Sequence, residues 1–295
     1  MSLYAKLREG TVQVGPVTVP WYDTEGGEPG EPPVVLLHGT TGPAEANFWA
    51  LFPMLAFTRR VITLDFTLPS DDVELTLDHY VAQAEAVIAS RCPGQPVSLV
   101  GHSLGAVIAA ALAGRSPALV DSLVLVAGWL RTDRQQLLRN HVWQTMHAEG
   151  SAALSEFAIY TAYSQPYLLS RTPRDYQALL AGAARRSTSP RVMELNRHID
   201  ILADCLRITA PTLVVGCTFD QMVPIRHSRE LFGAIADSRY LEIASGHAAV
   251  QERASEIFVI IDRFAAAPRA AAAGTILSST GASINAPAAS SRSSQ

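Results

Sequence analysis

The sequence predicts an α/β fold with a doubly wound, mostly parallel sheet. Several short runs of Val, Leu and Ile are apolar throughout, which is typical of parallel strands that are covered on both faces. Helical patterns lie between these runs, and such alternation is typical of βαβ units. The 295 residues, 48% of them hydrophobic, suffice for one large domain or for a domain with an insertion.

The elements can be assigned in chain order. The first is a hairpin over residues 11–26, because alternating residues flank a turn at Gly15 and Pro16. The predicted strands that follow cover 34–37, 61–64, 97–100, 123–127, 212–216 and 239–243. The predicted helices cover 46–57, 76–91, 103–114, 226–236 and 249–264.

One long interval, residues 130–206, has helical patterns and no convincing strand. It predicts a helical insertion that acts as a cap over the carboxyl edge of the sheet, where α/β folds bind ligands. Residues 1–129 and 207–265 then form the core. Residues 266–295 are rich in Ala and Ser, and we expect them to form a disordered tail.

Composition excludes several classes of protein. The formal net charge is −4 and no basic cluster is interleaved with aromatics, so we expect no nucleic-acid partner. No apolar run reaches the roughly 18 residues of a membrane span. The start, MSLYAKLREG, is charged early and lacks the apolar core of a secretion signal. The three cysteines, Cys92, Cys205 and Cys217, have no metal-like spacing. We therefore expect a cytoplasmic protein with no metal and no cofactor.

A serine stands between two glycines where a strand gives way to a helix. In VSLVGHSLGAVIAAALAG, residues 97–114, Ser103 lies between Gly101 and Gly105. A G-x-S-x-G motif at such a junction can expose a nucleophilic hydroxyl on a sharp turn, and the glycines remove side chains that would collide there. The motif alone is weak evidence, because a serine at the start of a helix also serves as an N-cap.

An acid and a histidine follow the serine along the chain, each just past a predicted strand. A serine becomes nucleophilic when a base takes its proton, and an acid must orient that base. Asp220 follows the predicted strand 212–216, and His247 follows the next strand. Asp133 is a rival acid, since it follows the strand 123–127.

The chain resembles the α/β-hydrolase superfamily over roughly residues 11 to 265, in the segments VVLLHGTTG, GHSLG, GCTFDQMVP and SGHAAVQE. The resemblance implies that Ser103 is the nucleophile, His247 the general base and Asp220 its partner. It also implies an oxyanion hole formed by the backbone N–H groups of Thr40 and Leu104. His38 and His102 are expected to support loops.

One segment departs from the pattern of many relatives, which have D-x-x-G-x-G-x-S after the strand 61–64. This chain reads DFTLPSDDVELTLDHY there, without glycines. We expect this loop to border the pocket, so the departure bears on the subfamily and on which substrate the pocket accepts, and not on the three catalytic residues.

The helical insertion supplies candidates for the pocket wall, namely Trp129, Trp143, Tyr160 and Tyr163. Aromatics at these spacings more often pack helices together, although a cap must also line one wall of the pocket. Residues 130–200 hold nine arginines against six acids, a local charge of +3. This charge suits an acidic substrate or an acidic acyl carrier, although a solvated helix face explains it equally well.

The sequence favours a serine hydrolase that acts on a small-molecule ester, lactone or thioester with a compact apolar acyl group, through an acyl-enzyme. An alternative keeps the fold but changes the reaction to acyl transfer, lyase or elimination chemistry in specialised-metabolite biosynthesis. A third reading is a ligand-binding pseudo-enzyme that retains the pocket. The fold does not decide among them.

Overall fold

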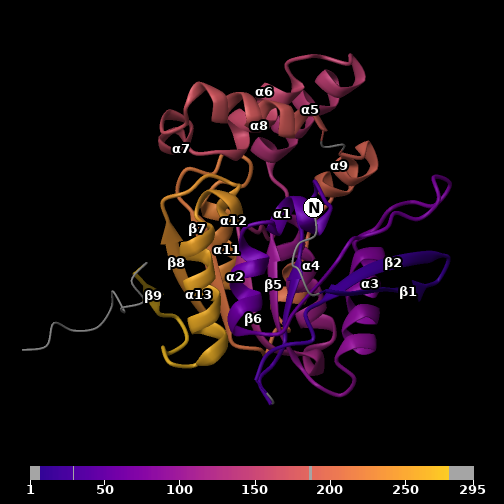
Figure 1. Ribbon diagram of the computed structural model, residues 1–295, viewed down its shortest axis with the longest axis vertical. Helices are drawn as coiled ribbons and strands as arrows, with labels where there is room; N and C mark the ends of the chain where they lie inside the picture. The colour runs from indigo at the N-terminus through magenta and orange to yellow at the C-terminus, as the bar shows by residue number, and fades with distance from the viewer. Residues whose placement is uncertain (1–6, 29, 186–187, 279–295) are drawn as a thin grey trace, which may run out of the picture.

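The computed structural model describes residues 7–28, 30–185 and 188–278, and within them one mixed sheet forms the centre of the molecule (Figure 1). The strand order is β1-β2-β4-β3-β5-β6-β7-β8-β9. The strands are β1 (Arg8–Val14), β2 (Val17–Asp23), β3 (Val34–Leu37), β4 (Val61–Leu64), β5 (Val97–His102), β6 (Val120–Val126), β7 (Thr212–Cys217), β8 (Ser238–Ile243) and β9 (Ile276–Leu277). Neighbours from β4 to β9 are parallel, while β1–β2 and β2–β4 are antiparallel, which confirms the predicted fold class.

Helices cover both faces of the sheet. The core helices are α1 (Ala44–Phe48), α2 (Leu51–Thr58), α3 (Leu77–Arg91), α4 (Leu104–Arg115), α11 (Arg226–Ala234), α12 (Ala249–Glu252) and α13 (Ala254–Ala266), with the 3-10 turn η1 (Pro117–Leu119). On one face, α1, α2 and α13 bury side chains such as Phe52 and Ile261 against the strands. On the other, α3, α4 and α11 form a separate core that includes Ile88 and Leu231. Because both faces are covered, β3, β4 and β5 are buried along their whole length.

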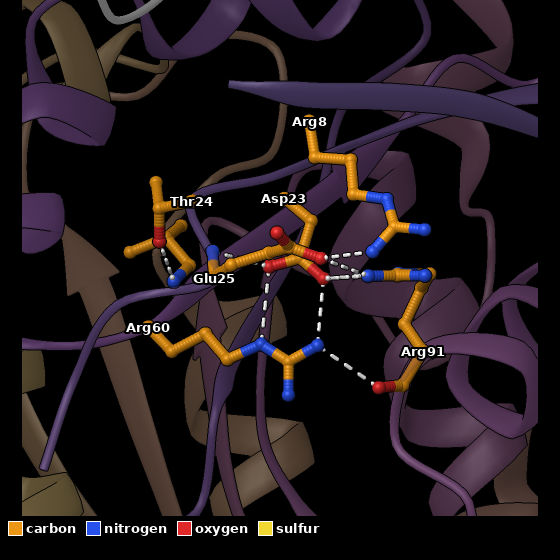
Figure 2. Close-up of polar contacts among 7 residues, drawn as sticks. Arg8, Asp23, Thr24, Glu25, Arg60 and Arg91 are labelled. Carbon is orange, nitrogen blue, oxygen red and sulfur yellow. Dashed lines mark hydrogen bonds and ion pairs between the residues drawn. The ribbon is translucent and has the colours of Figure 1, made fainter. Parts of the chain in front are cut away.

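The N-terminal hairpin is fastened to the sheet by a buried carboxylate (Figure 2). Asp23 accepts two hydrogen bonds from Arg60, at 3.0 and 2.6 Å, one from Arg91 at 2.9 Å and one from the backbone N–H of Glu25 at 2.8 Å. Burial alone would raise the pKa of Asp23, but the hydrogen bonds, first of all those from Arg60, hold it below its usual value. The network joins β2 to the residue before β4 and to the end of α3.

The described residues between 130 and 200 form the helical insertion and lie over the carboxyl ends of the parallel strands (Figure 1). Its helices are α5 (Arg134–Ala148), α6 (Leu154–Ala162), α7 (Gln165–Leu169), α8 (Pro173–Arg185) and α9 (Pro190–Arg197). The predicted end of the insertion at residue 206 is wrong, because α10 (Leu202–Cys205) packs against the C-terminal end of α4, where Asp204 pairs with Arg115 at 2.9 Å. An isolated antiparallel bridge and a 2.9 Å ion pair join Arg131 to Asp200, so the two ends of the insertion are tied together. No helix in the described ranges is long and apolar enough to cross a membrane.

Two predicted helices are each divided in two. The segment 46–57 contains the end of α1 and most of α2, with a break at Trp49 and Ala50. The cause is Pro53, because proline has no N–H to donate to the carbonyl of Trp49 and its ring would clash with that carbonyl in a continuous helix. The segment 249–264 divides into α12 and α13 at Arg253.

The expectation of a disordered tail from residue 266 is wrong for residues 266–278. Beyond α13 the chain turns back, and β9 pairs in parallel with β8. The backbone N–H of Gly274 donates to Ser238 at 2.8 Å, and that of Tyr240 donates to Thr275 at 3.0 Å. Backbone pairing along a sheet edge needs no apolar periodicity, which explains why composition gave no sign of it. The rest of the predicted tail, residues 279–295, lies outside the described residues.

Candidate active site

The strand-to-helix junction holds Ser103 in a conformation that few side chains adopt, with φ 57° and ψ −123°. A Cβ on Gly101 would lie 2.2 Å from the carbonyl oxygen of Gly105, and a Cβ on Gly105 would lie 2.0 Å from that of Leu37. Only glycine therefore fits at either position. The Ser103 side chain makes no capping hydrogen bond to α4, so its hydroxyl does not serve as the N-cap that the sequence left open.

The structure brings Ser103, His247 and Asp220 together in a hydrogen-bonded chain. The Nδ1 of His247 lies 2.8 Å from Oδ2 of Asp220, and Nε2 lies 2.7 Å from Oγ of Ser103. A carboxylate only accepts, so Nδ1–H donates to Asp220 and Nε2 of the neutral ring accepts from the serine hydroxyl. All three residues are buried. The backbone N–H groups of Met222 and Val223 donate to Oδ1 of Asp220 at 2.8 Å each and fix the carboxylate. Such a chain can remove the serine proton.

The rival acid, Asp133, has other partners. It caps α5 by accepting a 2.8 Å hydrogen bond from the backbone N–H of Gln136. Its carboxylate also pairs with Arg226 and lies 3.2 Å from Nε2 of His227. Asp220, and not Asp133, therefore occupies the place beside His247.

Two further histidines support the loops around this chain, as the sequence predicts. His102 donates from Nε2 to the backbone carbonyl of His247 at 2.8 Å. Burial, followed by the proximity of His247, lowers the pKa of His102 to about 3, so its ring is neutral. His38 donates from Nδ1 to the carbonyl of Gly39 at 2.8 Å and accepts from the N–H of Phe66 at 3.3 Å. Burial also lowers the pKa of His38.

The two groups expected to form an oxyanion hole lie on loops beside the serine. Leu104 directly follows Ser103, and Thr40 follows Gly39, where an added Cβ would lie 3.1 Å from the Cβ of Ser103. Within the described ranges, neither the N–H of Thr40 nor that of Leu104 donates to another residue. Both are thus free to bind an oxygen of a ligand.

Two asparagines hold the Thr40 loop, and sequence analysis missed both. Asn47, on α1, accepts from the N–H of Gly39 at 3.4 Å and donates to the carbonyls of Thr41 and Pro43 at 3.3 and 3.0 Å. Asn196, on α9 of the helical insertion, donates to Oγ1 of Thr40 at 2.9 Å. No local pattern marks either residue, because their contacts lie in loops that only the fold brings close.

A cavity of about 510 Å³ opens above Ser103 and is roofed by the helical insertion. Of the predicted wall residues, Trp129, Trp143 and Tyr163 line it. The fourth, Tyr160, does not, because its side chain is 62% exposed. The face of α6 that lines the cavity carries Ser155, Ala158, Ile159 and Ala162. Tyr160 lies one residue beyond Ile159, about 100° around the helix, and so faces away from the cavity.

The loop after β4 does not border the cavity either, contrary to our expectation. None of the described residues 66–76 lines it. Instead, Arg191 of α9 holds this loop with hydrogen bonds to the carbonyls of Pro69, Ser70 and Val73 at 2.8, 3.0 and 2.7 Å and to Asp71 at 2.8 Å. This loop therefore contacts the helical insertion and not the cavity.

Comparison with known proteins identifies the family. The profile of the family described as "alpha/beta hydrolase fold" matches residues 32–254. The chain belongs to the α/β-hydrolase fold family. It is 30% identical over 268 residues to the Pyrrolizixenacetamide deacetylase of Xenorhabdus hominickii, covering 88% of this chain and 97% of that protein.

Solved structures of this family superpose over most of the chain. The structure of Rv0554 from Mycobacterium tuberculosis matches with a TM-score of 0.75 and 26% identity, covering 88% of this chain and 98% of that one. The enol-lactonase from Burkholderia xenovorans LB400 matches with a TM-score of 0.70 and 20% identity, covering 86% of this chain and 99% of that one, and this likeness shows the fold. The expected family is confirmed, and its relatives support a hydrolase-type α/β enzyme.

Proposed function

We propose that this protein is a serine hydrolase that cleaves a small ester, lactone or thioester with a compact acyl group. The observation that carries the proposal is the Ser103–His247–Asp220 hydrogen-bonded chain at the base of the cavity beneath the helical insertion. A strained turn that presents a serine hydroxyl to a buried histidine and aspartate has no evident structural purpose that a simpler residue could not serve.

The first half-reaction forms an acyl-enzyme. Oγ of Ser103 attacks the carbonyl carbon while its proton passes to Nε2 of His247, and Asp220 stabilises the resulting imidazolium. The oxyanion of the tetrahedral intermediate binds the N–H groups of Thr40 and Leu104. When the intermediate collapses, the bond to the leaving group breaks and that group takes the proton from His247. In the second half-reaction a water molecule attacks the acyl-enzyme by the same route and frees Ser103.

A second candidate is deacetylation of an acetamide, favoured by the similarity to Pyrrolizixenacetamide deacetylase over 88% of the chain. The two candidates share the acyl-enzyme and differ in the leaving group, which is an amine in the second. An amine needs protonation by His247 before it can leave, whereas a phenolate does not. Substrates with the same acetyl group and different leaving groups therefore separate them.

The test measures kcat/KM for p-nitrophenyl acetate, butyrate and octanoate and for 4-nitroacetanilide, with Ser103→Ala as the control. We expect turnover of the short esters and a loss of about 10⁴-fold in kcat in the variant. Turnover of 4-nitroacetanilide at a rate near that of the acetate ester would favour the deacetylase. A Ser103→Ala protein that keeps more than a tenth of the ester turnover would refute the proposed nucleophile.

A further inference from the structure

A cationic side chain faces the active-site cavity from the helical insertion. Helix α5 presents one face to the cavity, formed by Gln136, Arg139, Asn140, Trp143 and His147. These residues recur every three or four positions, which is the spacing of a single helix face. Arg139 is the strongest charge on that face.

Arg139 has no anionic partner in the part of the chain that the structure describes. No carboxylate pairs with it, and its Nε is buried without a hydrogen-bond acceptor. The ring of Phe157 lies beside it, with its centroid 5.9 Å from Cζ of the guanidinium. Other arginines of the helical insertion are paired, such as Arg131 with Asp200 and Arg191 with Asp71.

The formal charges on the described residues that line the cavity are positive. None of the described residues that line it is Asp or Glu, and a second arginine, Arg185, lies exposed along its wall. Burial lowers the pKa of Arg139 to about 10, and the charge of Asp220 opposes that shift. The guanidinium is therefore still cationic at neutral pH. Asp220 makes no direct ion pair with it, and the oxygens of Asp220 accept from His247 and from two backbone N–H groups.

A purely structural role explains only some of the observations on the Arg139 side chain. The contact with Phe157 is made by the guanidinium, and an apolar residue could replace it without a desolvation cost. A ligand that supplies the missing acceptor explains two observations. These are the buried Nε of Arg139 that has no acceptor, and the absence of carboxylates from the described cavity wall.

We propose that Arg139 binds an anionic group of the substrate, a carboxylate remote from the scissile bond. Guanidinium groups bind carboxylates through a rigid, two-pronged set of N–H donors, which gives orientation as well as attraction. The inference rests on the proposed function and narrows its substrate to small acyl compounds that carry such a group. The carboxylate belongs either to the acyl part, as in a half-ester of a dicarboxylic acid, or to the leaving group.

Two matched substrate pairs test both positions of the carboxylate. Monomethyl glutarate is compared with methyl pentanoate for the acyl part, and 4-acetoxybenzoate is compared with phenyl acetate for the leaving group. The variants are Arg139→Gln, which removes the charge, and Arg139→Lys, which keeps the charge but lacks the paired N–H donors of a guanidinium. Arg134→Gln, at an exposed position on the same helix, and Arg185→Gln are the matched controls.

We expect the unsubstituted protein to prefer the charged member of at least one pair. Arg139→Gln should lower kcat/KM for that member by about 10- to 100-fold, mainly through KM, because a charged hydrogen bond is lost. The neutral member should change by less than threefold. The kcat/KM of Arg139→Lys for the charged member should lie between those of the unsubstituted protein and Arg139→Gln. Both control variants should keep the preference for the charged member.

Several results would overturn the inference. These are no preference in either pair, a preference that survives Arg139→Gln, or an equal loss with Arg185→Gln. An equal fall for the charged and neutral members, with an altered pH profile, would show that Arg139 acts on His247 and Asp220 instead. If neutral esters are hydrolysed without a preference, only this inference fails. If no ester is hydrolysed at all, the proposed function fails with it.

A second measurement avoids variants that could fold poorly. Glutarate and its neutral diamide, glutaramide, are compared as inhibitors of phenyl acetate hydrolysis by the unsubstituted protein. Competitive inhibition by glutarate, at least tenfold stronger than by glutaramide, supports a carboxylate site in the cavity. Equal inhibition by the two compounds contradicts it.

Discussion

Replacing Asp220 with asparagine changes one atom of the hydrogen-bonded chain and should nearly abolish turnover. Oδ1 of Asp220 accepts the N–H groups of Met222 and Val223, so the oxygen of an asparagine will take that position and its NH₂ group will face His247. An NH₂ group cannot accept from Nδ1–H. The histidine must then carry its proton on Nε2, where it cannot accept the proton of Ser103.

The size of this effect follows from the loss of the reactive tautomer. The same change in a well-studied serine protease lowers kcat by about 10⁴-fold, which corresponds to roughly 5 kcal/mol of barrier. We expect a similar loss here with little change in KM, measured with p-nitrophenyl acetate under saturating conditions. Asp133→Asn is the control, because Asp133 follows a strand as Asp220 does but caps α5. The reasoning is refuted if Asp220→Asn keeps a tenth of the turnover, or if Asp133→Asn loses as much.

Three further predictions follow from the described contacts. Trp143→Ala should change the ratios of kcat/KM among esters of different acyl chain length by an amount equivalent to about 1–3 kcal/mol. Tyr160→Ala should leave these ratios unchanged, because the side chain of Tyr160 is exposed, and equal effects of the two substitutions would contradict the assigned cavity wall. Truncation after Arg269 removes β9 and should lower the Tm by several degrees relative to truncation after Ser278, and equal Tm values would show that β9 contributes nothing. Burial lowers the pKa of His102 in the folded protein to about 3, whereas a histidine in the unfolded chain titrates near pH 6.5. Between these two pH values only the unfolded chain binds the proton, so the free energy of unfolding should fall as the pH drops from 6.5 toward 3. Urea titrations should show a smaller fall for His102→Gln, and an equal fall in both proteins would mean that His102 is not held neutral.

Much of the scaffold could be predicted because its signals are local. The strands 34–37 and 61–64 are bounded as the apolar runs indicate, since parallel strands covered on both faces must be apolar at every position. Ser103 was identifiable because the turn that holds it tolerates only glycine at positions 101 and 105. The family, once suspected from four segments, is confirmed by the matching profile.

The remaining features depend on contacts between distant segments. Asp133 and Asp220 both follow strands, and only the assembled sheet shows which of them reaches His247. The split of the predicted helix 46–57 follows from the position of Pro53 within it, a signal that the apolar pattern concealed. Arg139 is one of nine arginines in residues 130–200, and nothing local distinguishes it from those that form surface ion pairs.

The central claim is that Ser103 is a nucleophile activated by His247, and covalent labelling tests it most directly. The protein is treated with a small fluorophosphonate, and its intact mass and the modified peptide are measured by mass spectrometry. The account predicts one adduct per chain, located on Ser103, absent from Ser103→Ala and slowed by at least 100-fold in His247→Ala. Labelling of another residue, or labelling of Ser103 at an unchanged rate in His247→Ala, would contradict it.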